Sequence, residues 1–282
     1  MTLLQIVVVA VIQGLAELLP VSSSAHVVVA EKLMGLNPSA PAMTFLLVML
    51  HTGTTFAVIL YFWPRWKERF LKAGAAARRE AAQALVLATG ATGVVGIFLM
   101  LVIEKVVLRH ARHDEVEALF SNLPLIAAAL ASVGVLILWA ARRDGADAGR
   151  AHPLDARGSL WIGAVQGLCL PFRGFSRSGA TISLGLMLDV PRALAEDFSF
   201  ALAVILTPPV IAKETWRLMK SPEGLHAASF TPGLVGMVFS FLAGLAALRW
   251  LSSWLERGRW RWFGWYCLAA SAAVAFAAFR LG

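Results

Sequence analysis

Residues 166–189 hold a cluster of polar side chains inside an apolar region of the chain. The stretch reads QGLCLPFRGFSRSGATISLGLMLD and contains an arginine surrounded by hydroxyl residues and glycines. An arginine at bilayer depth costs at least about 2.5–3.5 kcal/mol on insertion scales, which makes it a candidate functional residue. Its planar fork of donors matches phosphate oxygens, and glycines let backbone N–H groups approach the same oxygens. We therefore predict a phosphate clamp formed by Gly174, Ser176, Arg177, Ser178 and Thr181.

A related tract near the N-terminus, residues 13–26, carries a carboxylate, three serines and a histidine in the sequence QGLAELLPVSSSAH. These residue types suit a base or metal ligand at Glu17, a nucleophile at Ser23 and a proton carrier at His26. A helix that begins near the serines would also direct its free N–H groups at an anion. Two structural alternatives remain open: the serines fill a helix-packing seam below an interfacial Glu17, or Arg177 is a static partner of Glu17.

Other residues give weaker signals. His51 lies in the middle of an apolar run, where it either lines the same pocket or is a hydrogen-bonded packing residue. The two cysteines, Cys169 and Cys267, have no spacing typical of a metal site or a disulfide. The sequence contains no Walker A pattern and no GxGxxG after a strand, so we predict no nucleotide site.

The composition is that of a membrane protein. Of the 282 residues, 59% are hydrophobic and only 15% are charged, and the mean hydropathy is +0.72; soluble domains carry about 25% charged residues. The net charge of +8 does not indicate nucleic-acid binding, because the basic residues cluster between apolar runs, where they set membrane topology and meet anionic lipid headgroups. We expect the membrane, and no nucleic acid, as a partner.

Six apolar stretches are candidates for helices that cross about 30 Å of hydrocarbon. The basic segments 64–79 and 142–157 read as polar connections, residues 213–230 read as a loop, and Pro208 and Pro209 are expected to kink the end of the fourth span. The predicted spans are 43–63, 83–103, 123–141, 198–212 with its neighbours, 234–251 and 263–279.

The two polar tracts lie between apolar pieces too short to span the membrane. Residues 2–36 and 160–188 each read as two half-helices around a polar tip, which is typical of a re-entrant hairpin. The tracts align at an offset of 153 to 154 residues, and three spans follow each. An odd number of crossings inverts the second copy, as in inverted-repeat transporters. We predict an all-α integral membrane protein, one domain over 1–282, with inverted repeats at about 1–141 and 157–280.

The distribution of basic residues predicts an orientation. One face receives connections with thirteen lysines and arginines and the other receives six, which places the first face in the cytoplasm. Both termini and the polar site are then expected on the periplasmic side of the inner (plasma) membrane.

Taken together, these tracts resemble a known family. The LPVSSSAH and FSRSGAT tracts, Phe198-Ser199-Phe200, His51-Thr52-Gly53-Thr54 and Phe263-Gly264-Trp265-Tyr266 are similar to the bacterial undecaprenyl-diphosphate phosphatases, the bacitracin-resistance proteins. The resemblance covers nearly the whole chain. It implies a membrane hydrolase that removes the terminal phosphate of a C55 polyprenyl diphosphate and so recycles the lipid carrier of cell-wall precursors. A homodimer is compatible with it.

The resemblance also implies a site. The family uses a glutamate pair, a serine tract with a histidine, an arginine–serine tract and a divalent cation, Mg²⁺ or Ca²⁺. Glu17 would bind the cation. By position, the residues are Glu17, Ser22, Ser23, His26, Ser176, Arg177, Ser178 and Thr181.

Three positions depart from the family pattern. Gln13 replaces the first glutamate of the pair, which removes a charge, and Ala25 stands where glycine is usual. Arg173 precedes Gly174 where proline is usual, and Pro171 lies two residues earlier. We expect Gln13 and Arg173 to contact the substrate. A lipid-phosphate flippase would need the same anion-binding residues and is the alternative function.

Overall fold

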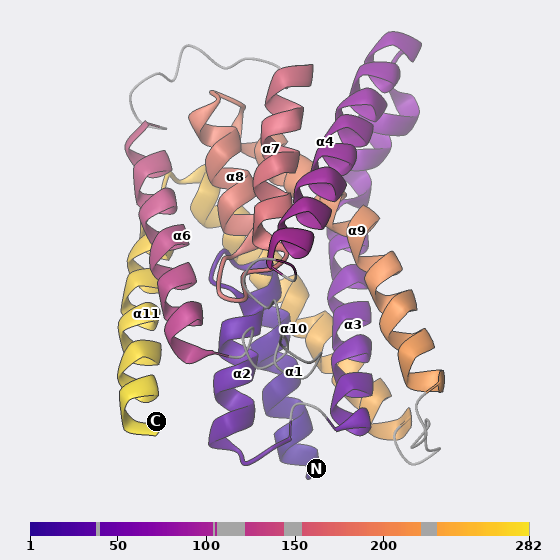
Figure 1. Cartoon of the computed structure of the whole chain (residues 1–282). Helices are drawn as coiled ribbons and strands as arrows, with labels where there is room; N and C mark the ends of the chain where they lie inside the picture. The colour runs from indigo at the N-terminus through magenta and orange to yellow at the C-terminus, as the bar shows by residue number, and fades with distance from the viewer. Residues whose placement is uncertain (38–39, 104, 106–121, 144–153, 221–229, 282) are drawn as a thin grey trace. The chain divides into compact units, whose positions relative to one another are not determined.

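A computed structural model describes residues 1–37, 40–103, 105, 122–143, 154–220 and 230–281, and within these every regular element is a helix. Six helices are long and apolar enough to cross a membrane, which confirms the predicted all-α class with six spans. They are α3 (Pro41–Trp66), α4 (Ala75–Val102), α6 (Leu123–Arg143), α9 (Arg192–Lys220), α10 (Phe230–Glu256) and α11 (Arg261–Leu281) (Figure 1).

Two pairs of short helices coincide with the predicted half-helices. The first pair is α1 (Leu3–Leu18) and α2 (Ser23–Leu33), and the second is α7 (Ala156–Cys169) and α8 (Arg177–Met187). Each polar tract runs from the end of the first helix of its pair, through a short turn, into the second helix. The re-entrant path of these pairs and the inversion of the repeats stay predictions.

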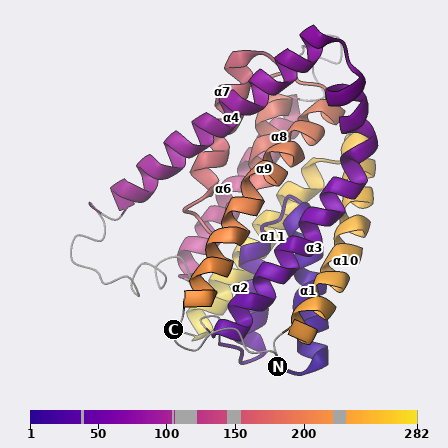
Figure 2. The ribbon, with the colours of Figure 1, turned by 90° about the vertical axis from the view of Figure 1, so that its right-hand side faces the viewer.

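Two connections predicted as loops are helical. The segment 64–79 contains the end of α3, a π-helical turn η1 (Lys67–Lys72) and the start of α4 at Ala75. Alanine has high helix propensity, and so do lysine, arginine and glutamate although they are charged. Similarly, α9 continues through Pro208 and Pro209 to Lys220, and Figure 2 shows it as one ribbon. Prolines are tolerated in membrane helices because neighbouring groups can satisfy the freed backbone. Directly before the two prolines, the Thr207 hydroxyl donates to the Ala203 carbonyl at 2.8 Å.

The chain divides into two compact units. The first unit comprises residues 1–19, 23–64 and 200–251, and the second comprises residues 20–22, 65–199 and 252–282. Each unit therefore combines segments of both predicted repeats. The helices α3, α9 and α10 each contribute to both units.

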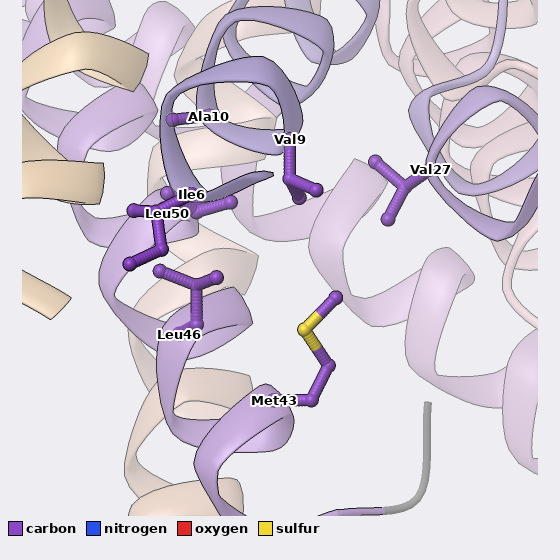
Figure 3. Close-up of a cluster of buried hydrophobic side chains, with 7 residues drawn as sticks. All are labelled: Ile6, Val9, Ala10, Val27, Met43, Leu46 and Leu50. Atoms are coloured by element: carbon purple, nitrogen blue, oxygen red, sulfur yellow. The ribbon is translucent and has the colours of Figure 1, made fainter. Parts of the chain in front are cut away.

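The first unit has an aliphatic core built from one face each of α1, α2 and α3. Figure 3 shows its seven buried members, Ile6, Val9, Ala10, Val27, Met43, Leu46 and Leu50. The helix α10 approaches α1 closely at Gly14, where an added Cβ would lie 2.5 Å from the Ser240 carbonyl oxygen. The Ser240 hydroxyl donates to the Leu50 carbonyl on α3 at 2.8 Å. These contacts position the end of α1 that carries Glu17 and the middle of α3 that carries His51.

In the second unit, α4 packs along α7 and α6 packs along α11, while α8 lies against α6 and α7 (Figure 1). The interface of α4 with α7 requires glycine at position 163. An added Cβ there would lie 2.6 Å from the Ala88 Cα, too close for a side chain to fit. The Thr92 hydroxyl bridges this interface by contacting the Gly163 carbonyl at 2.9 Å and accepting from Gln166 Nε2 at 3.1 Å. Close helix approach with hydroxyl bridges is typical of membrane interiors.

Candidate functional site

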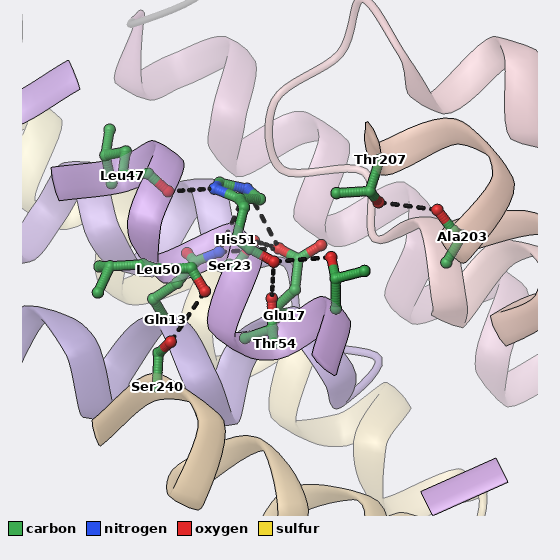
Figure 4. A network of polar contacts seen from close by, with 11 residues as sticks. Gln13, Glu17, Ser23, Leu47, Leu50, His51, Thr54, Ala203, Thr207 and Ser240 are labelled. Atoms are coloured by element: carbon green, nitrogen blue, oxygen red, sulfur yellow. Dashed lines mark hydrogen bonds and ion pairs between the residues drawn. The ribbon is translucent and has the colours of Figure 1, made fainter. Parts of the chain in front are cut away.

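A cluster of polar side chains surrounds the Glu17 carboxylate at the end of α1 in the first unit (Figure 4). Gln13 and Glu17 are four residues apart and therefore neighbours on one helix face. Gln13 Nε2 donates to Glu17 Oε2 at 3.2 Å. The Ser23 hydroxyl, at the start of α2, donates to the same oxygen at 2.5 Å, a short distance for a hydrogen bond. The structure thus brings together three residues that the sequence predicted for one site.

His51 of α3 joins this cluster. Its Nδ1 lies 2.8 Å from the Leu47 carbonyl oxygen, and because a carbonyl only accepts, Nδ1 carries the hydrogen. In the neutral ring Nε2 is then an acceptor for Gln13 Nε2 at 3.3 Å, and it lies 3.8 Å from Glu17 Oε2. These contacts give His51 a place in the polar cluster; whether it lines the substrate pocket or serves as a hydrogen-bonded packing residue stays open. The sequence feature that pointed to His51 was its position at the centre of an apolar span.

The serine turn leads directly into α2. Ser22 is buried and has φ +67°, a left-handed conformation that is uncommon for a residue with a side chain. His26 lies three residues after Ser23, on the same face of α2, and is half-buried. Because Ser23 is the first residue of α2, the N–H groups in the first turn of this eleven-residue helix lie next to the serine turn. Contact of His26 with the reacting groups stays a prediction.

The arginine–serine tract forms the start of α8 in the second unit. Ser176 caps the helix, and its hydroxyl accepts from the Gly179 N–H at 3.2 Å. Arg177 is the first helical residue and donates from Nη1 to the Ser199 carbonyl on α9 at 3.2 Å. The Thr181 hydroxyl lies 2.6 Å from the Ser199 hydroxyl.

Three hydroxyls of this tract are buried: Ser176, Ser178 and Thr181. The turn before α8 requires glycine at position 174, where φ is +102° and an added Cβ would lie 2.6 Å from the Ile126 carbonyl oxygen. The neighbouring Arg173 is exposed. Its role as a second phosphate contact stays a prediction.

The members of each of the two polar groups belong to a single unit. The first contains Gln13, Glu17, Ser23 and His51, and the second contains Ser176, Arg177, Ser178, Thr181 and Ser199. Sequence reasoning did not assign a role to Ser199, although Phe198-Ser199-Phe200 is one of the tracts that resemble the family. The joint action of both groups on one substrate, and the alternative of a static Arg177–Glu17 pair, stay predictions.

The residues around Glu17 suit a weakly held, oxygen-preferring cation. Among the described residues, no group of three or more histidine, cysteine, aspartate or glutamate side chains could hold a metal ion. Mg²⁺ is commonly bound through one or two carboxylates, with water and substrate phosphates as its other ligands. Glu17 with the Gln13 amide oxygen fits that pattern. A Ca²⁺ site with six to eight oxygen ligands would need more oxygens from the substrate.

Comparison with known proteins identifies relatives along the whole chain. The family model described as "Bacitracin resistance protein BacA" matches residues 6–273. Undecaprenyl-diphosphatase 2 of Acinetobacter baylyi is 55% identical over 281 residues, covering 97% of both chains. Undecaprenyl-diphosphatases of Acidovorax ebreus and of a Polaromonas species are 35% and 31% identical, covering 96% of this chain and 93% and 94% of theirs.

Proposed function

The chain belongs to the bacitracin resistance protein BacA family, and we propose how its two polar groups divide the work of an undecaprenyl-diphosphatase. It is a multi-pass bacterial membrane protein that hydrolyses undecaprenyl diphosphate to undecaprenyl phosphate and inorganic phosphate. This reaction recycles the lipid carrier of cell-wall precursors. The names of the relatives give no support to the alternative of a lipid flippase.

The observation that carries the proposal is the hydrogen bond from the Ser23 hydroxyl to Glu17 Oε2 at 2.5 Å. A serine that donates to a carboxylate is activated as a nucleophile, because the carboxylate accepts its proton as the oxygen attacks. Ser23 Oγ would bond to the terminal phosphorus while the bond from that phosphorus to the bridging oxygen breaks. Undecaprenyl phosphate leaves, and the proton moves to Glu17.

The second half of the reaction restores the enzyme. Water attacks the phosphoserine and gives one proton to His26, which passes it to solvent. Inorganic phosphate leaves, and Ser23 recovers its proton from Glu17. Direct attack by water on the diphosphate is the competing route, and only the first route forms a phosphorylated Ser23.

The arginine–serine group would bind the phosphates. The Arg177 fork and the Ser176 and Ser178 hydroxyls can stabilise negative charge that grows on the phosphate oxygens in the transition state. Thr181, whose hydroxyl donates to the Arg177 carbonyl at 2.9 Å, would support the arginine. Arg173 and Ser22 would add contacts to the same substrate. A divalent cation held by Glu17 and Gln13 would supply further neutralisation of the diphosphate charge when bound.

The orientation of the site is also part of the proposal. The excess of basic residues in the connections assigned to the cytoplasm supports a polar site that is open to the periplasm. The C55 tail would lie among the lipids while the diphosphate enters the polar site. A homodimer stays a prediction.

The test is release of phosphate from undecaprenyl diphosphate by the purified protein in detergent with Mg²⁺ or Ca²⁺. We expect Glu17→Ala and Arg177→Ala each to lower kcat by about 10²- to 10³-fold, as for the loss of a single charge-stabilising group. Gln5→Ala, at the start of α1, is the control. Acid quenching followed by mass spectrometry should find phosphate on Ser23. No phosphate release with either metal, together with lipid movement across vesicles, would overturn the enzymatic function.

A further inference from the structure

Ser199 makes two contacts with the phosphate-binding tract although it belongs to another helix. It lies in the first two turns of α9 and has no exposed area. Its carbonyl accepts from Arg177 Nη1 at 3.2 Å, and its hydroxyl lies 2.6 Å from the Thr181 hydroxyl. On the basis of the function proposed above, we infer that Ser199 is a positioning residue that aims the Arg177 guanidinium at the substrate.

The hydrogens of the two hydroxyls define how this contact operates. The Thr181 hydroxyl has one hydrogen and lies 2.9 Å from the Arg177 carbonyl. A carbonyl only accepts, so the Thr181 hydrogen goes to Arg177 and Ser199 donates to Thr181. Ser199 therefore holds Arg177 at both ends. Its carbonyl accepts from the guanidinium, and its hydroxyl donates to Thr181, which in turn donates to the Arg177 carbonyl.

The segment of α9 that carries Ser199 is itself anchored by buried charges. Glu196 and Asp197, each 2% exposed, precede Ser199 within one helical turn. Arg65 Nη1 lies 3.1 Å from Glu196 Oε2 and also 3.1 Å from Asp197 Oδ1. Arg69 Nη1 lies 3.1 Å from Asp197 Oδ2.

A further hydrogen bond secures the same segment. The Ser252 hydroxyl donates to Glu196 Oε1 at 2.5 Å. Helix α9 is thus tied at this point to α3, η1 and α10. A hydrogen bond to an anchored helix restricts the orientation of a guanidinium plane. A hydrogen bond to a mobile segment would not restrict it, because the segment would move together with the arginine.

The consequence is specific to catalysis. A guanidinium binds phosphate oxygens through a rigid fork, so a change in its plane weakens the interactions that are strongest in the transition state. Ser199→Ala keeps the backbone carbonyl that contacts the guanidinium and removes the hydroxyl that holds Thr181 against the Arg177 backbone. We expect this variant to lower kcat about tenfold and to change KM less than twofold. The tenfold change corresponds to about 1.4 kcal/mol of transition-state stabilisation, which is the size of one hydrogen bond.

Ser183→Ala is the matched control. Ser183 is a fully buried serine in α8 whose hydroxyl accepts from Trp260 Nε1 at 3.0 Å, so its removal also deletes one buried hydrogen bond. We expect this variant to lower thermal stability as Ser199→Ala does and to leave kcat unchanged. A kcat for Ser199→Ala equal to that of Ser183→Ala would overturn the inference.

A double variant tests the connection through Thr181. Thr181→Val removes the hydroxyl that links Ser199 to Arg177, so the double variant with Ser199→Ala should be no slower than the slower single variant. Losses that multiply would show independent action and overturn the inference. If Ser199→Ala does not fold, Ser199→Cys replaces it, because cysteine has nearly the same volume as serine and is a weaker hydrogen-bond donor. A kcat of Ser199→Cys equal to that of the wild type would also overturn the inference.

The same assays separate this inference from the proposed function. A wild-type protein that releases no phosphate overturns the function, and the inference with it. A wild-type protein that is active, with Ser199→Ala matching the control in kcat, overturns the positioning role alone.

Discussion

Replacing Gln13 by glutamate places a second carboxylate beside Glu17. Gln13 is 2% exposed, and its Nε2 lies 3.2 Å from Glu17 Oε2. Two carboxylates at this separation repel by about 5 kcal/mol at an effective dielectric constant of 20. The Glu17 side chain is 21% exposed, so solvent screens part of this repulsion. A divalent cation between the carboxylates would remove the remainder.

We therefore expect Gln13→Glu to be less stable than the wild type without divalent cations and to bind Mg²⁺ more tightly. The Mg²⁺ concentration for half-maximal phosphate release should fall at least about tenfold, which needs only about 1.4 kcal/mol of the repulsion. Thermal unfolding with and without chelator measures the stability change. Equal Mg²⁺ midpoints and equal unfolding temperatures for both proteins would refute the reasoning.

Gln5→Glu is the charge control for this experiment. Gln5 occupies the third position of α1, where its side chain accepts from the Thr2 N–H at 2.8 Å in a capping box. Glutamate serves equally well in that motif. This variant adds the same charge to the same helix and should leave the Mg²⁺ midpoint unchanged.

Two further predictions concern the packing and the buried charges. Gly163→Ala should lower the free energy of unfolding by about 3 kcal/mol, the upper part of the range for overpacking, because a Cβ there would overlap the Ala88 backbone; thermal unfolding in detergent would measure it. Arg65→Ala should cost about 3 kcal/mol in the same measurement, because it leaves Glu196 and Asp197 buried with less compensating charge. This is the low end of the range for a broken buried pair, since the Arg65 side chain is 32% exposed.

The chain offers a control for each. Gly90 has open space where a Cβ would be added, so Gly90→Ala should not lower stability. Lys67 is an exposed neighbour of Arg65, and Lys67→Ala should leave the unfolding temperature near that of the wild type. An equal loss in a variant and its control would contradict the packing or ion-pair explanation.

The limits of sequence reasoning appear clearly in the helix α4. Gly90, Gly93 and Gly96 lie at a spacing that suits one face for close helix packing. Of the three, Gly96 meets the end of α7 at Gly167 and at Leu170, the residue that follows the helix, while Gly90 and Gly93 face open space. Which face of a helix packs depends on its rotation about its own axis, and that rotation is decided by the partner helix.

The polar connections between the spans also differ from the sequence prediction. Residues 67–72 and 213–220 were predicted as loops because they are polar, yet they are helical. Hydropathy reports the ability to enter the membrane, and helix formation depends on propensity and on continuation of the backbone hydrogen bonds. A polar extension of a span is therefore helical whenever its residues favour a helix.

The sequence by itself determined the membrane class, the six spans and the two polar tracts, because each depends on residues that are close along the chain. It also identified Glu17, Ser23 and Arg177 as candidate reacting groups, since charged and hydroxyl residues in apolar segments are costly. Only the tertiary structure placed His51 beside Gln13, 38 residues away, and Ser199 beside Thr181, 18 residues away. These contacts join different helices, and helix packing alone decides which side chains meet.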